Sequence, residues 1–389
     1  MAIKRLYFCQ IHYQYIILFM KLPLYIHIPF CRKKCRYCGF FSRAYSSAPA
    51  EKLIDVYRKQ IEEFWRQEVS FNYIYIGGGT PSVLEEKLLR RLLDSLKRFS
   101  PEEFSFEANP ESLSLSCLKI LREGGVNRLS IGVQTFSHPY LTFLGRLHTP
   151  YEAQEAVENA YKVGFRNLNI DLIFALPGQN INEVLKDLKK ALRLPLTHLS
   201  LYALIYEPYT PLYRLLQRGE VGKLEEEKEA EMYKRSVEFL ESRGFLRYEV
   251  SNFAREGFSC RHNINYWQDL PYLALGPSAV YFYQNRRYRY ISNIASYIEK
   301  AARGGELWEF VETIKGEKYA REKAAFNIRL AGGIDLEEFE KTTGFDLLLL
   351  ASREIKELRR QKLVSLVKRR LRLTGQGFLF ADYVSRKFV

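Results

Sequence analysis

The chain lacks the features of a secreted or membrane-embedded protein. It has only six cysteines in 389 residues, and three of them crowd one loop, which is not the arrangement of a disulfide framework. The apolar run "YQYIILFM" near its start is too short to span a bilayer, and no small-residue cleavage site follows it. With 47% hydrophobic and 27% charged residues, the composition is that of a globular chain with one large and one smaller domain. We therefore predict a reducing, cytoplasmic setting.

The chain also has few blocks of charge of one sign. Its net charge is +14, but acidic residues are interleaved with basic ones nearly everywhere. The one concentrated basic run lies in 363–373, and we interpret it as a solvated or wing-like surface rather than a specific nucleic-acid site. Weak attraction to acidic partners, or peripheral contact with anionic lipid headgroups, fits this surface.

Strand-like and helix-like segments alternate six times. Short runs rich in Ile, Val, Phe and Tyr predict strands, and segments with apolar residues at three- and four-residue steps predict helices. The predicted strands cover 23–28, 73–78, 103–109, 128–134, 167–176 and 198–204. The predicted helices cover 51–67, 85–99, 114–125, 151–164, 181–192 and 226–244. Such alternation indicates βαβ units around a parallel sheet, in a partial βα barrel or an open doubly wound sheet.

Unusual loops follow five of the predicted strands. They are the cysteine loop and the segments 77–81, 107–110, 132–134 and 176–179. In βα barrels, the rim at the carboxyl ends of the strands is where sites are built. We therefore predict an α/β fold, a partial (β/α)6 barrel with a small, mainly helical C-terminal domain.

The order of these patterns predicts four regions. Residues 1–19 are read as an N-terminal extension with Met20 as the working start, and 20–250 as the barrel. An aromatic-rich segment and linker covers 251–319, and a small helical or winged domain covers 320–389. Within that domain, 363–380 is predicted to form a helix, a hairpin and a helix.

Three thiols lie in "YIHIPFCRKKCRYCGFFS", at Cys31, Cys35 and Cys38. Soft thiolates at this spacing suit zinc or an iron–sulfur cluster. A structural zinc site closes with four ligands, and a second C-x-x-C pair is missing here. His27 can supply a fourth ligand only by folding back from its strand. A 4Fe–4S cluster held by three cysteines is favoured, since its fourth iron stays open for an amino and a carboxylate group.

The C-x3-C-x2-C spacing, with Tyr37 directly before the third cysteine, resembles the radical S-adenosylmethionine superfamily. The glycines of "GGGTP" can bring backbone close to the methionine amino group, while Glu107 and Asp171 can accept hydrogen bonds from ammonium or ribose hydroxyls. Arg146 is a candidate bidentate hydrogen-bond donor to the methionine carboxylate, and Gln134 adds a polar contact on the rim.

The motifs "YIYIGGGTPS", "FSFEANPESL", "GVNRLSIGVQTF" and "SLYALIYEP" bring the resemblance closer, to the oxygen-independent coproporphyrinogen III oxidase family. It runs from about residue 22 to the C-terminus and implies that Cys31, Cys35 and Cys38 hold the cluster. It further implies an S-adenosylmethionine site lined by Tyr25, Tyr37, Gly78, Gly79, Thr80, Glu107, Gln134, Arg146, Asp171, Ala203 and Val280.

Two features distinguish branches of this family. The oxidase branch carries a further cysteine two places after the third, where this chain has Phe40. The segment "RHNINYW" resembles the HNxxYW signature of the HemW-type heme chaperones, which implies that His262 is an axial heme ligand. Cys260 can add a thiolate or a covalent link. The chain departs from the HemW pattern at Gly39, where an acidic residue is common, and at Val280, where a histidine is common.

These resemblances imply a heme chaperone that binds heme, a 4Fe–4S cluster and S-adenosylmethionine and transfers heme to an acceptor. The expected partners are heme donor and acceptor proteins, including membrane-associated respiratory proteins, with no specific nucleic acid and a monomeric or homodimeric state. The alternative is the coproporphyrinogen III oxidase reaction of porphyrin biosynthesis, a radical oxidative decarboxylation. A weaker third hypothesis is nucleic-acid binding through the basic C-terminal region. The sequence assigns no catalytic residue.

Overall fold

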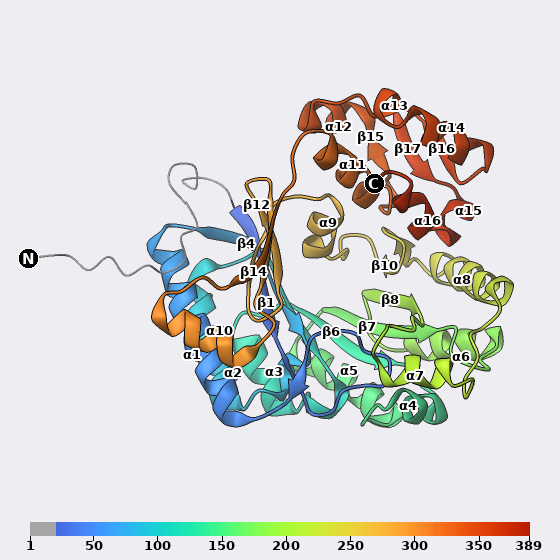
Figure 1. Cartoon of the computed structure of the whole chain (residues 1–389). Coiled ribbons are helices and arrows are strands. Elements are labelled where there is room, and N and C mark those ends of the chain that lie inside the picture. The colour runs from blue at the N-terminus through green and yellow to red at the C-terminus, as the bar shows by residue number, and fades with distance from the viewer. Residues whose placement is uncertain (1–20) are drawn as a thin grey trace, which may run out of the picture. The chain divides into compact units, whose positions relative to one another are not determined.

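The computed structural model describes residues 21–389, which divide into two compact units (Figure 1). The first contains the described part of Met1–Ile170 with Ile205–Val221 and Pro271–Glu312. The second contains Asp171–Leu204, Gly222–Leu270 and Thr313–Val389. The predicted extension, 1–19, and the predicted start at Met20 lie outside the described residues, and the linear domain boundaries stay predictions.

A parallel sheet forms the centre of the first unit. Its neighbouring strands, in order, are β11 (Leu273–Leu275), β1 (Lys21–Ile28), β4 (Ser70–Gly78), β5 (Glu103–Ala108) and β6 (Arg128–Gln134). Leu24 and Ile26 of β1 are fully buried, and so are Ile74 and Ile76 of β4. Strands buried this completely belong to parallel sheets covered by helices.

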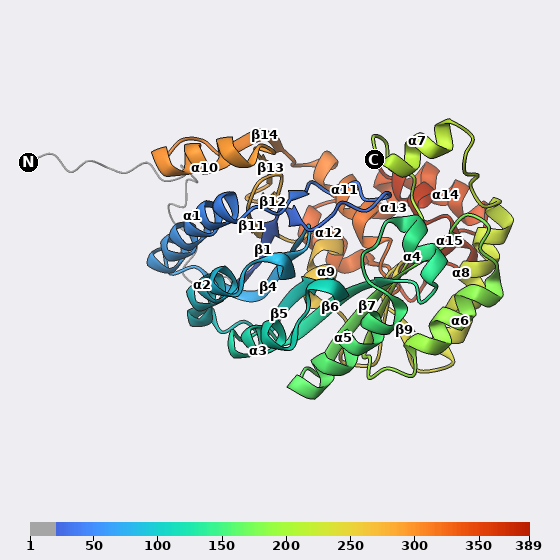
Figure 2. The ribbon, with the colours of Figure 1, turned by 90° about the horizontal axis from the view of Figure 1, so that it is seen from below.

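Helices come after β1, β4, β5 and β6 along the chain and cover the sheet, as Figure 2 shows for α1, α2 and α3. Leu88, Leu89, Leu92, Leu93 and Leu96 form the buried stripe of α2 at helical spacing. The helices of this unit are α1 (Ser47–Arg66), α2 (Glu86–Leu96), α3 (Leu115–Glu123), α4 (His138–Leu144), α5 (Pro150–Val163), α7 (Pro211–Gln217) and α10 (Ile294–Arg303). Short 3₁₀ turns are η1 (Pro81–Val83), η2 (Lys97–Phe99) and η3 (Pro110–Ser112).

Two smaller sheets complete the first unit. The parallel pair β2 (Phe30–Cys31) and β3 (Arg43–Ala44) frames the cysteine loop. The three-stranded sheet β12 (Val280–Tyr283), β13 (Arg286–Tyr290) and β14 (Trp308–Thr313) leads into and out of α10. Helix α10 packs on α1, where Tyr57 and Tyr297 meet edge to face at 6.5 Å (Figure 1).

The second unit continues the alternation and then reverses it. Strand β7 (Asn167–Phe174) starts in the first unit, and α6 (Ile181–Ala191), β8 (His198–Ala203) and α8 (Glu226–Glu241) follow in the order of the chain. Strand β10 (Asn252–Ala254) then pairs antiparallel with both β8 and β9 (Leu246–Arg247). The strand–helix alternation of the sequence therefore ends near residue 250 because an antiparallel strand follows there. The short helix α9 (Arg261–Trp267) comes next.

The C-terminal part of the second unit is mainly helical. Its helices are α11 (Glu317–Asn327), α12 (Leu336–Thr343), α13 (Leu347–Leu350), α14 (Ser352–Arg360), α15 (Gly375–Leu379) and α16 (Ala381–Arg386). A small sheet has the order β15 (Ile334–Asp335), β17 (Arg370–Leu373), β16 (Val364–Val367). Of the helix, hairpin and helix predicted for 363–380, the β16–β17 hairpin and helix α15 are present. The predicted first helix is wrong, because α14 ends at Arg360 and strand β16 begins at Val364.

All six predicted strands and the helices that follow them are present, and the α/β class with a parallel sheet is confirmed. Sequence periodicity missed the short helices α4, α7 and α9, helix α10 and the β12–β14 sheet. Helices of about two turns show too few repeats for their period to stand out. Within residues 21–389, no helix is long and apolar enough to cross a membrane.

Candidate functional site

The cysteine loop follows β1 and is held by backbone hydrogen bonds on several sides. The Arg36 N–H donates to the Leu144 carbonyl at 3.0 Å, and the Tyr45 N–H donates to the Cys31 carbonyl at 2.9 Å. Within the loop, the Cys38 N–H donates to the Cys35 carbonyl at 3.3 Å. The described cysteines are all free thiols. The loop is therefore an ordered turn whose backbone is fixed on several sides.

The glycine loop after β4 lies directly against this turn. The Gly79 N–H donates to the Ile28 carbonyl at 2.8 Å, and the Thr80 N–H donates to the Phe30 carbonyl at 2.7 Å. A Cβ atom on Gly79 would lie 2.5 Å from the Phe30 oxygen and 2.9 Å from its nitrogen. Because backbone atoms cannot yield as a flexible side chain can, this close approach requires glycine.

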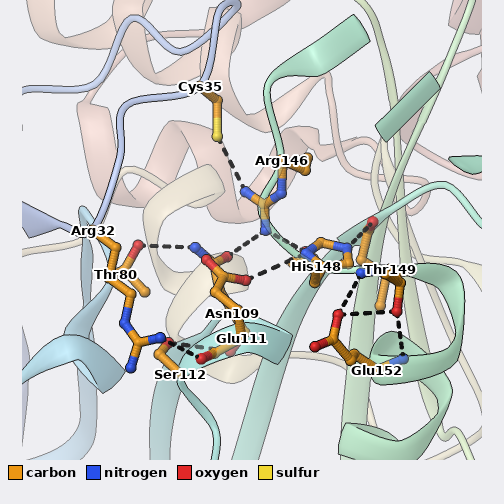
Figure 3. A network of polar contacts seen from close by, with 12 residues as sticks. Arg32, Cys35, Thr80, Asn109, Glu111, Ser112, Arg146, His148, Thr149 and Glu152 are labelled. Atoms are coloured by element: carbon orange, nitrogen blue, oxygen red, sulfur yellow. Dashed lines mark hydrogen bonds and ion pairs between the residues drawn. The ribbon is translucent and has the colours of Figure 1, made fainter. Parts of the chain in front are cut away.

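Two side chains donate to cysteine sulfurs. Arg146 Nη1 donates to Cys35 Sγ at 3.3 Å, and Thr80 Oγ1 lies 3.5 Å from Cys31 Sγ. Asn109 connects the two donors, because its Oδ1 accepts from Arg146 Nη2 at 2.7 Å and its Nδ2 donates to Thr80 Oγ1 at 3.0 Å (Figure 3). Hydrogen bonds to cluster sulfurs are one of the means by which proteins set cluster potentials.

Arg146 is the centre of this polar network. Its Nη2 also donates to the Gly132 carbonyl at 2.6 Å. Burial by itself would lower the pKa of Arg146, but Tyr37, Cys35 and Glu111 raise that pKa above its usual value. The guanidinium therefore stays charged. Its buried Nε has no hydrogen-bond partner among the described residues, so this one N–H remains for the predicted methionine carboxylate.

A second pair of polar side chains, His148 and Glu111, lies near Arg146. His148 Nδ1 lies 3.3 Å from Glu111 Oε2, and His148 Nε2 lies 3.1 Å from the Val133 carbonyl (Figure 3). Burial opposes the ionisation of Glu111, yet the hydrogen bond to His148 and the charge of Arg146 hold its pKa below the usual range. Glu111 is therefore a fixed negative charge that balances the guanidinium.

Glu107 of β5 holds the glycine loop from the other side. Its Oε1 accepts from Tyr75 Oη at 2.7 Å, and its Oε2 accepts from the Gly78 N–H at 3.0 Å. Carboxylate oxygens are acceptors that suit an ammonium or hydroxyl donor. A Cβ atom on Gly77 would lie 2.8 Å from this carboxyl group, so a larger residue here would push the carboxylate out of its position.

His27 does not belong to a metal site. Its Nδ1 lies 2.9 Å from Tyr25 Oη, and its Nε2 lies 3.0 Å from the Phe41 carbonyl. Burial lowers the pKa of His27, so the ring is neutral and both nitrogens are engaged. His27 is therefore hydrogen-bonded through both ring nitrogens, which disfavours it as the fourth ligand of a zinc site.

The three thiols are of the soft ligand type that holds iron–sulfur clusters. Burial raises the pKa of the Cys38 thiol, and the neighbouring Cys35 and Cys31 raise it further, against a hydrogen bond from the Phe40 backbone and the charge of Lys34. The two neighbouring cysteines thus oppose the ionisation of Cys38, and a bound cation would offset that effect. A metal cluster supplies that charge, and Arg146 lies beside one of the sulfurs.

The remaining predicted residues divide between the two units. Gln134 ends β6 in a left-handed conformation with φ of 67°, and Val280 begins β12. Both belong to the first unit with the cysteine loop. Asp171 in β7 and Ala203 at the end of β8 belong to the second.

Within the second unit, Asp171 lies near Tyr202. Burial raises the pKa of Tyr202 most, and the charges of Asp171 and Glu249 raise it further. Tyr202 is therefore a neutral hydroxyl group beside two acidic side chains.

The HNxxYW residues share helix α9 in the second unit. His262 and Tyr266 are four positions apart, so they lie on one face of the helix. Burial lowers the pKa of His262 to about 4, which leaves a neutral imidazole at pH 7, the form that binds iron. Tyr266 is 41% exposed and meets Trp267 edge to face at 5.5 Å.

Asn263 ties the N-terminal half of α9 to the strands. Its Nδ2 donates to Tyr248 Oη at 3.3 Å, and that hydroxyl lies 3.0 Å from Nε2 of His198 on β8. The motif therefore combines an imidazole, an amide that fastens the helix, and an aromatic surface. Cys260 is the buried residue just before the helix.

Sequence reasoning missed several residues of the first-unit network. Asn109 was noted only as part of a loop, and Glu111 and His148 were not singled out. The one available signal was their position, because 107–110 follows a strand and His148 follows Arg146 by two residues. Their side-chain pairing depends on the way in which β5, β6 and α4 come together.

Comparisons with known proteins cover almost the whole chain. The Radical SAM superfamily model matches residues 25–191, and the HemN C-terminal domain model matches residues 314–380. The heme chaperone HemW of Lactococcus lactis is 37% identical over 370 residues, covering 94% of this chain and 96% of that protein. That of Bacillus subtilis is 34% identical, covering 94% and 98%.

One solved structure has a similar fold over nearly the full length. The coproporphyrinogen III oxidase HemN of Escherichia coli, titled a radical SAM enzyme, superposes with a TM-score of 0.82. The match covers 95% of this chain and 90% of that one at 22% sequence identity. This likeness concerns the fold.

Proposed function

Because the chain belongs to the HemN-like radical S-adenosylmethionine family, in its HemW branch, we propose that it binds heme and transfers it to an acceptor protein. The proposal includes a 4Fe–4S cluster and S-adenosylmethionine as resident groups. The observation that carries it is helix α9, where a neutral imidazole and an exposed aromatic side chain share one face.

Cys31, Cys35 and Cys38 would hold the cluster. Such a cluster supplies an electron at low potential and an iron with an open coordination position. Arg146 and Thr80 stabilise negative charge on two of the sulfurs through their hydrogen bonds. Glu107 holds the glycine loop in place and would accept a hydrogen bond from the methionine ammonium group, while Arg146 keeps one N–H for the carboxylate.

His262 would offer its imidazole to heme iron as an axial ligand. Its lowered pKa keeps the ring unprotonated, so no proton has to leave before iron binds. Tyr266 and Trp267 would provide aromatic surface against the porphyrin, which is large and apolar. An exposed aromatic side chain on a short helix suits a cargo that has to leave again.

The partners of this transfer would be a heme donor and a heme acceptor, with membrane-associated respiratory proteins as the class of acceptor. The exposed basic turn at Lys368 and Arg369 supports a peripheral contact with an acidic protein or lipid surface. A monomer or a homodimer fits this proposal, and the setting would be the cytoplasm.

The test is a ferric heme titration of the cluster-reconstituted protein, run beside an anaerobic assay with S-adenosylmethionine, a reductant and coproporphyrinogen III. We expect one heme per chain, bound tightly, and no formation of protoporphyrinogen. Decarboxylation over many turnovers without heme binding would contradict the proposal and favour the oxidase reaction. Phe40 in place of the further cysteine argues for the first result.

His262→Ala tests the ligand. Heme affinity should fall at least tenfold, and the absorption of the bound heme should change, while iron and sulfide contents stay equal to those of the wild type. Unchanged heme affinity and spectrum would move the axial ligand to another residue. Cys260→Ala, in the same preparation, asks whether the neighbouring thiol contributes.

A further inference from the structure

Helix α9 receives two hydrogen bonds at its C-terminal end from helix α11. Asn327 Nδ2 donates to the Trp267 carbonyl at 3.0 Å, and Lys323 Nζ donates to the Gln268 carbonyl at 2.7 Å. The last carbonyls of a helix have no partner within the helix, and donors here also interact with the negative end of its dipole. Both donors come from one face of α11, four positions apart.

Lys323 is an unusual residue for this place. Only 5% of it is exposed, and burying an ammonium group costs free energy unless partners compensate. Burial lowers the pKa of Lys323, whereas Asp269 and Glu338 raise it. The carbonyl at the C-terminal end of α9 and these two carboxylates thus offset part of the cost of burying the ammonium group of Lys323.

An aromatic contact joins the same two helices. The ring of Phe326 lies 5.5 Å from that of Tyr266 and 6.1 Å from that of Trp267, and the guanidinium of Arg329 lies 4.7 Å from the Trp267 ring. Because helices as short as α9 are marginal on their own, tertiary contacts set its rotation about its axis. Lys323, Phe326 and Asn327, called here the α11 clamp, supply these contacts at its C-terminal end.

The N-terminal half of α9 is held differently, by Asn263 and Tyr248. The backbone near Tyr248 also connects to the region after α11, because the Ala331 N–H donates to the Tyr248 carbonyl at 2.9 Å. Both ends of the helix that carries His262 therefore depend on residues between 323 and 331.

We propose that Lys323, Phe326 and Asn327 are positioning residues that fix the rotation of α9 and so the direction in which His262 offers its imidazole to heme iron. This inference rests on the proposed function. It gives the C-terminal domain a definite part in heme binding, since α11 lies within that domain. The clamp does not touch heme in this account and acts through α9 alone.

The experiment compares the full-length double variant Lys323→Met, Asn327→Leu with the wild type, both loaded with ferric heme. Methionine keeps the apolar stem of lysine and leucine keeps the bulk of asparagine, but neither donates a hydrogen bond. Heme loss is followed by transfer to excess apomyoglobin, and ligation by visible absorption and electron paramagnetic resonance. We expect the rate of heme loss to rise at least tenfold and the spectrum to become a mixture, with unchanged iron and sulfide contents.

Three variants sharpen the result. Lys323→Arg keeps the cation and the donors, so it should restore wild-type heme loss and a single spectrum. Lys341→Met removes an exposed lysine of α12 in the same domain and should change neither. Asn327→Ser removes one donor with the least disturbance, and if the double variant does not fold, a roughly threefold faster heme loss in this single variant supports the proposal.

The proposal is wrong if the double variant loses heme at the wild-type rate and keeps the wild-type spectrum. If the double variant does not fold, the same result in Asn327→Ser overturns the proposal. His262→Ala, run in parallel, separates this failure from that of the proposed function. If His262→Ala alters ligation but the clamp variants do not, only the clamp is wrong. If His262→Ala leaves the spectrum unchanged, heme is not bound through His262, and the clamp is wrong together with the ligand assignment. The heme titration of the wild type decides the proposed function separately.

Discussion

The cysteine loop and helix α9 hold their functional side chains by opposite means. Around the loop, hydrogen bonds run from Thr80 through Asn109 and Arg146 to Cys35. Glu111, which is hydrogen-bonded to His148, adds a negative charge near the guanidinium. Around α9, aromatic rings and a few hydrogen bonds at the two helix ends surround His262. The difference follows from charge, because thiolates need compensating cations and donors, whereas a neutral imidazole needs only orientation.

This contrast fits the proposed difference between a resident cluster and a heme that is transferred. A network of short hydrogen bonds rigidifies its site and resists loss of what it holds. An exposed tyrosine beside a neutral histidine offers apolar contact that can be made and released. We therefore expect the two regions to fail independently, and the following predictions test that independence.

The largest effect is expected from Cys35→Ala. Removing one of three thiolate ligands should abolish the broad visible absorption of the reconstituted cluster and most of its iron and sulfide, because the cluster then has too few protein ligands. Ferric heme binding should persist in the same variant. Cys117→Ala, which removes a buried thiol of α3, should retain the cluster. Loss of heme together with the cluster would show that the two regions are not independent.

Arg146→Met should have the next largest effect. The variant loses hydrogen bonds to Cys35, Asn109 and the Gly132 carbonyl, and a charged hydrogen bond contributes about 1.5–3 kcal/mol. We expect a free energy of unfolding lower by about 3 kcal/mol in urea melts, and a lower cluster reduction potential because a donor to sulfur is gone. Arg235→Met, at an exposed ion pair of α8, is the control and should change stability by under about 0.5 kcal/mol. A wild-type potential would remove Arg146 from the tuning of the cluster.

Gly79→Ala should cost about 1–3 kcal/mol of stability, the usual range for overpacking. Its Cβ would press on the Phe30 backbone and separate the glycine loop from the cysteine loop. Cluster reconstitution should therefore be slower and less complete. Gly222→Ala is the matched control, since its Cβ would meet nothing within 4 Å. Equal melting temperatures for the two variants would contradict the close approach.

The smallest effect concerns the second unit, through the pH dependence of Glu249. This side chain is 1% exposed, and burial raises the pKa of its carboxyl group against the hydrogen bonds from Asn252 and Ser251. The unfolded chain therefore ionises first as pH rises, and the folded state loses stability from the unfolded pKa up to the folded one. Each unit of pKa difference corresponds to about 1.4 kcal/mol.

Glu249→Gln cannot titrate, so its unfolding free energy should fall less between pH 4 and pH 8 than that of the wild type. Urea melts at both pH values measure this difference. A wild-type curve parallel to that of the variant would mean that the carboxyl group titrates normally.

Local patterns in the sequence carried much of this description. The spacing of Cys31, Cys35 and Cys38 indicated a cluster because ligand number and softness restrict the metal. The strand-end loops predicted that Gly78, Glu107 and Gln134 would gather on one side of the sheet, and parallel pairing places them there. Periodicity failed for α9, whose seven residues mix aromatic and polar side chains and give no clear apolar stripe.

The sequence by itself determined the family, the three-cysteine motif and the alternation that builds the parallel sheet, because each depends on residues close together along the chain. Only the tertiary structure decided that Arg146 donates to Cys35, that His148 and Glu111 support it, and that Lys323 and Asn327 hold the end of α9. These contacts join residues 37 to 111 positions apart, and no short-range pattern encodes them. Hydrogen bonds at such separations exist only once folding has brought their strands and helices together.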